Sequence, residues 1–253
     1  MKLLTFVTPP AVAARAPAPL ITPAMDSVRV AVQVHPARGG GDYFDALVID
    51  SAHLVFLLMD VAGQRISALN LAAFAQDTFR SRTPELFSGE SNQSEALSEL
   101  CLHLNRTILE TAGRAHLAAA FLGSFDGEDG TFSYINAGHV PGLLLAKDKT
   151  EFLESTGLPL GLFSHATHEA CSRVIPRGGA LLMASRGVVE ARSGILDCIG
   201  RSPEFGADGL LRATTGANRV ARSLCRIVLD TAAAYAGRHM ANPMSVAAIS
   251  RDT

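Results

Sequence analysis

The sequence predicts an α+β domain in which strands and helices are grouped in blocks. Apolar residues alternate along 28–34, and two β-rich runs at 43–50 and 53–59 follow as a hairpin. Helical periodicity then covers 64–80 and 93–112. This grouping lacks the single βα alternation of a doubly wound parallel sheet. With 48% hydrophobic and 18% charged residues, the chain can fill a sizeable core.

The rest of the chain adds strands and one more helix by the same criteria. Turn residues within 126–130 indicate a second hairpin, because Asp-Gly pairs tolerate positive φ. The remaining predicted elements are strands at 117–125, 131–136, 142–146, 180–185 and 245–250, and a helix over 220–231.

The N-terminal segment differs in composition from the rest. Five prolines and many alanines fall within residues 8–24, with almost no periodicity. Such a segment is typical of an extended arm or linker. We therefore expect residues 1–24 to form an arm and residues 25–253 to form one domain.

Charge and cysteine content limit the class of protein. The 22 Lys and Arg residues against 24 Asp and Glu residues leave a net charge of −2, so a nucleic-acid partner is not expected. No apolar run approaches about 18 residues, so no membrane-spanning helix is expected. Four scattered cysteines without a CxxC pair, and no signal-peptide core, predict reduced thiols and a cytoplasmic location.

The most informative residues are Asp42 and Asp60. Each is nine residues from Ser51, so a hairpin that turns near Ser51 places them opposite each other at its open end. Two carboxylates this close repel unless one is protonated or a cation lies between them. The pair therefore predicts a Mg²⁺ or Mn²⁺ site. The alternative is an exposed pair of turn aspartates that caps the next helix.

Six segments match one set of motifs in order and spacing, over residues 28–251. They are GGGDYFDALVID (39–50), LLMDVAGQ (57–64), YINAGHVPGLLL (134–145), GLPLGLF (157–163), LLMASRGVVEA (181–191) and PMSVAAISR (243–251). The set resembles the motifs of the SpoIIE-type bacterial PPM (metal-dependent) serine/threonine protein phosphatases.

The resemblance implies a fold and a chemistry. The fold is a β-sandwich of two antiparallel sheets flanked by helix pairs, in four layers. The chemistry is hydrolysis of phosphoserine or phosphothreonine, in which divalent cations polarise the phosphate and activate a water, with no further catalytic side chain. By position, Asp60 would bind metal, the Val61 backbone carbonyl would complete one site, and Asp42 would support it.

The chain departs from the family where a second cation would bind. Arg186 stands in place of an aspartate, and Asn242 and Pro243 stand in place of paired aspartates. A guanidinium is always protonated, so we expect Arg186 to neutralise Asp42 and Asp60 in place of one metal. At most one Mn²⁺ or Mg²⁺ ion should then bind, and weakly.

Other polar residues are predicted to support this site. Arg65 and Arg186 are candidate phosphate-binding groups, because guanidinium groups bind phosphate oxygens in pairs. Asp45 is expected on the opposite strand face from the first aspartate, as a supporting residue. Asn136 and His139 are expected to form a turn at the rim of the site, with a general-acid role for His139 as the alternative.

Three classes of function remain open. The first is a phosphatase of attenuated activity that acts on a phosphorylated regulatory protein, such as an antagonist of an anti-sigma factor, as the resemblance implies. The second is an inactive pseudophosphatase that binds a phosphoprotein. The third is a structural domain, and homodimerisation is compatible with all three. Full catalysis requires acidic residues that positions 186, 242 and 243 lack, whereas cationic groups favour a binding role.

Overall fold

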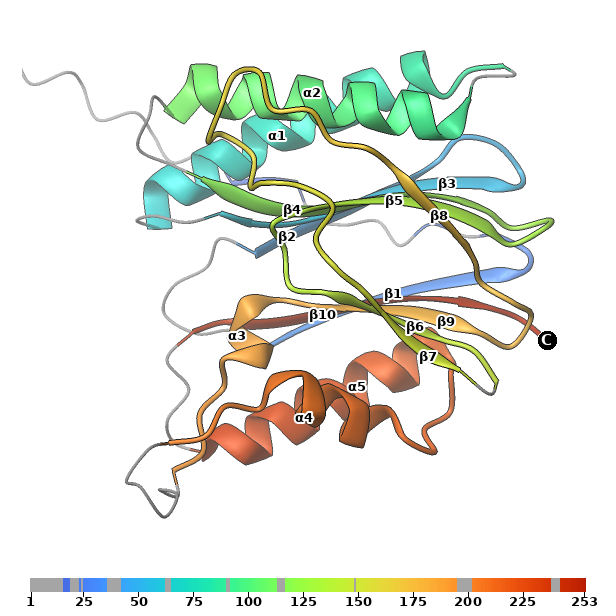
Figure 1. Cartoon of the computed structure of the whole chain (residues 1–253), viewed down its shortest axis with the longest axis vertical. Coiled ribbons are helices and arrows are strands. Elements are labelled where there is room, and N and C mark those ends of the chain that lie inside the picture. The colour runs from blue at the N-terminus through green and yellow to red at the C-terminus, as the bar shows by residue number, and fades with distance from the viewer. Residues whose placement is uncertain are drawn as a thin grey trace, which may run out of the picture.

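The protein folds as a four-layer sandwich, with two facing sheets between two layers of helices (Figure 1). This architecture confirms the predicted α+β class. The computed structural model describes residues 16–18, 23, 25–35, 42–61, 65–89, 92–112, 117–147, 149–194, 202–237 and 242–253.

Both sheets are antiparallel throughout. In sheet A the strand order is β1-β10-β9-β6-β7, and in sheet B it is β2-β3-β4-β5-β8. Sheet A consists of β1 (Val28–His35), β10 (Met244–Arg251), β9 (Ala180–Ala184), β6 (Gly142–Leu145) and β7 (Thr150–Leu153). Sheet B consists of β2 (Asp42–Val48), β3 (His53–Val61), β4 (Ala118–Asp126), β5 (Thr131–Ala137) and β8 (Cys171–Val174).

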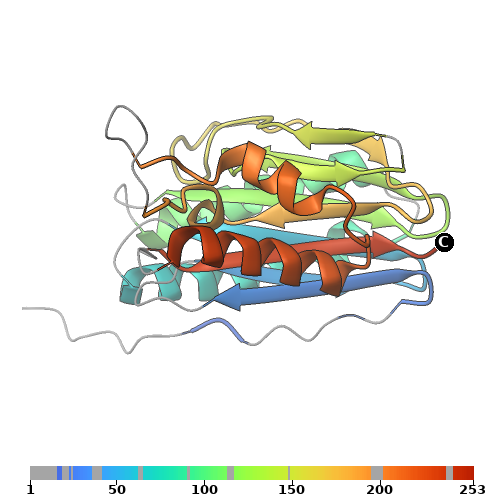
Figure 2. The same ribbon diagram turned by 90° about the horizontal axis from the view of Figure 1, so that it is seen from below.

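Two helices cover the outer face of each sheet. The pair α1 (Arg65–Leu86) and α2 (Gln93–Ala112) lies on sheet B. The pair α4 (Gly206–Thr214) and α5 (Ala221–Ala236) lies on sheet A, where α5 runs along β1 and β10 (Figure 2). A short helix, α3 (Arg186–Val189), follows β9. Of the helices in the described ranges, none is both long and apolar enough to span a bilayer.

Alternation along the strands divides the core into three parts. In β3, Leu54, Phe56 and Leu58 pack between the sheets, whereas Val55 and Leu57 pack against α1 and α2. Since successive side chains of a strand point to opposite faces, a strand in the middle of this sandwich must be apolar on both. The continuous apolar run of β3 therefore has a direct structural cause, as the sequence predicted.

The described part of the N-terminal segment contacts α1. The backbone N–H of Ala18 donates to Gln76 Oε1 at 2.6 Å, and Gln76 Nε2 donates to the Ala18 carbonyl at 3.1 Å. Gln76 Nε2 also lies 3.3 Å from Asp45 Oδ2, so the segment is linked to a buried side chain of β2. The proposed boundary between an arm and a domain at residue 25 stays a prediction.

An arginine joins the two sheets at the end farthest from the Asp42–Asp60 pair. Arg251, the last residue of β10, is buried and donates to the carbonyls of Asp129 at 2.9 Å, Ile175 at 3.2 Å and Glu128. Gly130 makes room for it, because a Cβ at that position would lie 2.1 Å from Arg251 Nη1. One charged group therefore satisfies backbone acceptors from the loops at this end of sheet B.

Replacing this arginine tests its contribution to stability. Arg251→Met should lower the free energy of unfolding by about 2–4 kcal/mol, because the buried Ile175 carbonyl and two part-buried carbonyls lose a charged donor. The measurement is urea denaturation at pH 7. The control is Arg192→Met, which removes an exposed ion pair to Glu204 of 2.8 Å and should cost less than about 1 kcal/mol. Equal losses in the two variants would contradict the role assigned to Arg251.

Candidate functional site

The structure places Asp42 directly opposite Asp60. They are the first paired residues of the β2–β3 hairpin, in the register that the sequence predicted. Asp42 lies on the same strand face as Phe44, and Asp60 on the same face as Leu58, and both of these apolar residues pack between the sheets. Both carboxylates are therefore on the inter-sheet side of sheet B, at one end of the sandwich.

Two serines of sheet A lie near Asp42. Ser185 follows β9 and Ser245 is the second residue of β10, and both are buried. The Ser245 N–H donates to Ser185 Oγ at 3.0 Å, and the Ser185 N–H donates to the Ser245 carbonyl at 2.8 Å. Their hydroxyls lower the pKa of Asp42, so they lie close to its carboxyl group. The site therefore contains side chains of both sheets.

Burial determines the ionisation of Asp42. It raises the pKa of this carboxyl from 3.8 to about 6, and the charge of Asp60 adds to the increase, whereas the hydroxyls of Ser245 and Ser185 oppose it. Asp42 Oδ2 and Ser245 Oγ are buried, and neither has a hydrogen-bond partner within the described residues. A buried acceptor without a partner is unfavourable, so the site favours a proton or a cation at Asp42.

His139 presents another unpartnered acceptor. Its Nδ1 lies 3.0 Å from the Val140 carbonyl, which can only accept, so Nδ1 carries the proton. Burial lowers the pKa of His139 and keeps the ring neutral, which leaves a lone pair on Nε2. Nε2 is buried and unpartnered in the described part of the chain. The charges of Asp60 and Arg186 also shift this pKa, in opposite directions, so both groups lie close enough to act on the ring.

Asn136 positions the turn that carries His139. Asn136 Oδ1 accepts the N–H of His139 at 2.8 Å, and its Nδ2 donates to the Leu153 carbonyl at 3.2 Å. Gly138 has a φ of +69°, and a Cβ there would lie 2.5 Å from Pro159 Cγ, so a glycine is required. Both polar ends of Asn136 are used within the protein. Asn136 therefore holds the turn in place.

The expected contact of Arg186 with the two aspartates is not what the structure shows. Its side chain is 57% exposed and its Nε lies 3.6 Å from Glu190 Oε1, one helical turn later. Arg186 is the first residue of α3, and i,i+4 side chains share a helix face. Within the described ranges, the ion pairs of Arg186 include neither Asp42 nor Asp60. Arg186 affects the site through its charge, which lowers the pKa of His139 without a hydrogen bond between them.

The three departures from the family pattern lie together. A Cβ at Gly187 would approach the Pro243 carbonyl to 1.8 Å and the Asn242 Cβ to 3.3 Å. The start of α3 is therefore in contact with the segment that leads into β10. Asn242 is exposed and Pro243 half-buried, and neither offers a carboxylate. The carboxylates of the family pattern are absent at these three positions, but the backbones of α3 and of the segment before β10 still lie in close contact.

Two other predicted site residues have different outcomes. Asp45 faces the helix layer, away from Asp42 as expected, and accepts from Arg80 Nε at 2.7 Å and from the Tyr43 hydroxyl at 2.6 Å. Its role is thus to anchor α1 on β2, and it does not contact the site. The Arg65 side chain lies outside the described residues, as do Gly39–Gly41.

The described residues offer two carboxylates to a cation. Asp42 and Asp60 provide two carboxylates, and Val61 ends β3 beside them. The unpartnered acceptors at Asp42 and His139 indicate that the site can receive a positive charge. Across the described ranges, no cluster of three or more His, Cys, Asp or Glu side chains is arranged to hold a metal ion. A second cation therefore has no acidic ligand set here.

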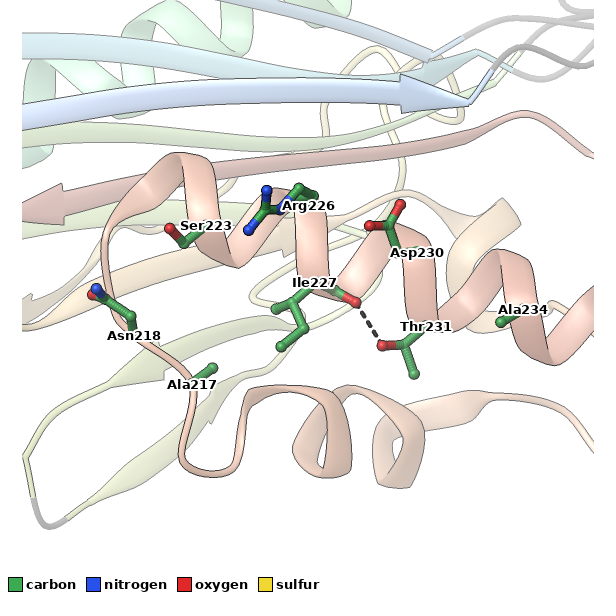
Figure 3. Close-up of a pocket in the computed structure, with 8 residues that line it drawn as sticks. All are labelled: Ala217, Asn218, Ser223, Arg226, Ile227, Asp230, Thr231 and Ala234. Atoms are coloured by element: carbon green, nitrogen blue, oxygen red, sulfur yellow. Dashed lines mark hydrogen bonds between the residues drawn. The ribbon is translucent and has the colours of Figure 1, made fainter.

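A cavity elsewhere on the surface is separate from this site. Figure 3 shows a groove of about 710 Å³ along the outward face of α5, with Arg226 and Asp230 among its lining residues. Thr231 Oγ1 donates to the Ile227 carbonyl at 2.6 Å within it. None of the predicted site residues lines this groove, which is on the other face of sheet A.

Comparison with known proteins identifies the family. The family model described as Stage II sporulation protein E (SpoIIE) matches residues 50–252. The chain belongs to the SpoIIE family. It is a PPM-type phosphatase domain, which agrees with the resemblance noted in the sequence.

The two curated relatives described next are each less than 30% identical to this chain. Protein IcfG of Synechocystis sp. is 26% identical over 204 residues, which cover 72% of this chain and 32% of IcfG. Phosphoserine phosphatase RsbP of Bacillus subtilis is 24% identical over 59% of this chain and 36% of RsbP. The chain thus spans about a third of the length of these two relatives. The RsbU and RsbW domains of Rv1364c from Mycobacterium tuberculosis share the fold, with a TM-score of 0.70 and 24% identity over 94% of this chain and 63% of that one.

Sequence reasoning missed Ser185 and Ser245. Both belong to segments that resemble family motifs, in which the departures at 186, 242 and 243 are the more conspicuous feature. The available signal was a small hydroxyl residue at the end of each of two apolar runs, 180–185 and 245–250. Adjacent strands with hydroxyls at matching ends can present both to one site.

The state of Asp42 gives a test by denaturation without metal. Asp42→Asn should raise the free energy of unfolding at pH 7 by about 1–3 kcal/mol, because an amide needs no ionisation when buried. The folded pKa is about 6 and the ordinary value is 3.8, so the wild type carries its full penalty above pH 6. The gain should shrink as the pH falls through 6 and disappear at about pH 3, below both pKa values, where both states are protonated. Urea denaturation in EDTA at several pH values measures it.

The control for this prediction is another aspartate of the same strand. Asp45→Asn should destabilise the protein by about 1.5–3 kcal/mol, because it weakens the charged hydrogen bonds to Arg80. The two substitutions remove the same charge from opposite faces of β2 and are expected to differ in sign. A stabilisation by Asp42→Asn that is equal at pH 4 and pH 7 would show that ionisation is not its cause.

Proposed function

We propose that this SpoIIE-family domain hydrolyses phosphoserine or phosphothreonine on a regulatory protein, with attenuated activity that depends on one Mn²⁺ or Mg²⁺ ion. The observation that carries the proposal is the Asp42–Asp60 pair, whose carboxylates face the inter-sheet space beside unpartnered buried acceptors. The relative RsbP is named a phosphoserine phosphatase, which supports the same substrate class. A phosphorylated antagonist of an anti-sigma factor is the partner type that we propose.

The chain's own residues divide the work by their chemistry. Asp42 and Asp60, with the Val61 carbonyl, would hold the ion, and below about pH 6 binding would displace the proton that burial retains on Asp42. The bound ion would neutralise phosphate charge and activate a water for attack on phosphorus. His139 Nε2 would accept a hydrogen bond from a water or hydroxyl, since its lone pair has no partner among the described residues. Asn136 keeps this ring in place.

Arg186 supports a second candidate function. Its exposed ion pair with Glu190 is long, at 3.6 Å, and such pairs are weak, so the guanidinium is available to a phosphate. A pseudophosphatase would use this cation to bind a phosphoprotein without turnover. Mn²⁺-dependent hydrolysis of p-nitrophenyl phosphate distinguishes the two candidates, because only the first predicts product. The expected rate is low, since one ion replaces the two of a binuclear site.

Removal of one carboxylate tests the ion site. Asp60→Asn should lower the affinity for Mn²⁺ at least tenfold, or about 1.4 kcal/mol, as measured by isothermal titration calorimetry. The matched control is Asp50→Asn at the other end of the same hairpin, where the side chain is 53% exposed, and its Mn²⁺ affinity should equal that of the wild type. Unchanged binding in Asp60→Asn would exclude Asp60 as a principal ligand.

Restoring the acidic positions tests the reason for the low activity. Arg186→Asp combined with Asn242→Asp should raise both the Mn²⁺ affinity and the rate of p-nitrophenyl phosphate hydrolysis, each by about tenfold or more. Arg192→Asp, a charge change at another exposed arginine, should alter neither. Rapid hydrolysis by the wild-type chain would show that its metal site is complete.

A further inference from the structure

Exposed apolar side chains line one side of the candidate site. Leu158 is 50% exposed, Leu162 39% and Phe163 47%, within the loop that contains the Gly-Leu-Pro-Leu-Gly segment. Leu117, which precedes β4, is 36% exposed. We call these four residues the apolar rim. Large apolar side chains that gather on a surface mark contact sites more often than scattered ones do.

The loop that carries the rim is held at several points. Asn105 of α2 is buried, accepts the Gly161 N–H at 2.7 Å and donates to the Phe163 carbonyl at 3.0 Å. Leu160 exchanges two backbone hydrogen bonds with Ala118, at 2.9 and 3.0 Å. His168 Nε2 donates to the Leu158 carbonyl at 2.7 Å. The backbone is therefore fixed while the side chains between these points stay exposed, which is the arrangement of a preformed contact surface.

The rim is adjacent to the candidate site on two sides. Ala118 pairs with Val61, next to Asp60, and also with Leu160 of the loop. Pro159 packs against Gly138, the residue before His139. The loop thus lies across the start of β4 from the end of β3, next to the turn that carries His139. A partner chain that extends from the two aspartates past the start of β4 would meet the rim.

Charge near the site specifies the occupant. Arg186 presents an exposed guanidinium at the start of α3, directly after Ser185 at the end of β9, so the site has a cation on its sheet A side and the apolar rim on its sheet B side. A phosphoserine with apolar neighbours matches both features, since the phosphate can meet the cation and the neighbours can meet the rim. We propose that the apolar rim binds apolar residues that flank the phosphoserine of a protein partner. This inference rests on the proposed phosphoprotein-directed function.

Two phosphoserine peptides test the rim directly. They are identical except that leucines flank the phosphoserine in one and glutamines in the other, and binding is followed by fluorescence anisotropy in Mn²⁺ with the full chain. The wild type should bind the leucine peptide on the order of fivefold to tenfold more tightly. Leu158→Asp and Leu162→Asp should each reduce this preference to less than about twofold.

A matched control separates the rim from a general loss of apolar surface. Val174 of β8 is 55% exposed and lies at the far end of sheet B, paired with Thr131. Val174→Asp should keep the full preference for the leucine peptide. Thermal unfolding of each variant checks that it is folded, and phosphate release from the same samples reports turnover.

Each outcome decides the proposal. Equal affinity for both peptides, a preference that survives Leu158→Asp, or no peptide binding at all would overturn it. So would a wild-type dimer that dissociates on Leu158→Asp, because a second copy would then occupy the rim. Hydrolysis of p-nitrophenyl phosphate without any peptide preference would reject the rim and retain the proposed activity. A peptide preference lost in the rim variants, without phosphate release, would support the rim and reject catalysis.

Discussion

The hydrogen-bond register of the β2–β3 hairpin is the constraint on which the site depends. It places two aspartates opposite each other and on the same face, the one that looks toward sheet A. A shift of one residue in either strand would turn that strand's carboxylate toward the helix layer, where Tyr43 and Met59 now pack. The observed register avoids this, because a carboxylate among the apolar side chains of the helix layer would be buried without a partner. The core of the sandwich and the polarity of its open end are therefore set by the same pairing.

The second sheet completes the site through backbone contacts that tolerate changes in the neighbouring side chains. Gly187 allows α3 to touch the Pro243 carbonyl, and Ser185 and Ser245 exchange backbone and side-chain hydrogen bonds across β9 and β10. These contacts do not require a carboxylate at 186, 242 or 243. This explains how the chain can have the family fold without carboxylates at these positions. Loss of acidic residues here changes the charge of the opening and leaves the frame intact.

Much of this architecture could be predicted from local patterns. The turn near Ser51 and the apolar run of β3 were sufficient for the hairpin, its register and its burial. The strands β7 and β8 were missed, because each has four residues and β8 is largely exposed, so neither gives a periodic signal. Helix α4 was missed as well, in a segment where its nine residues follow a region without clear pattern.

The site was predictable in its acidic half and less so elsewhere. Asp42 and Asp60 follow from pairing across a single turn, which sequence numbering reveals. The Arg186 side chain points toward Glu190 because Arg186 begins helix α3. The family motif alone could not predict where this guanidinium would lie. The proximity of Ser245 to Asp42 joins strands that are about two hundred residues apart, and only the packing of the two sheets brings them together.

The contact between Ala18 and Gln76 has a consequence for how the N-terminal segment is aligned on α1. Residues 17 and 19 are both prolines, which have no amide hydrogen, so Ala18 is the single position of this triplet that can donate to the Gln76 side chain. Sliding the segment by one residue in either direction would offer that glutamine a ring nitrogen. The two prolines thus fix the register of this segment on α1, although its alanine and proline side chains offer no polar group of their own.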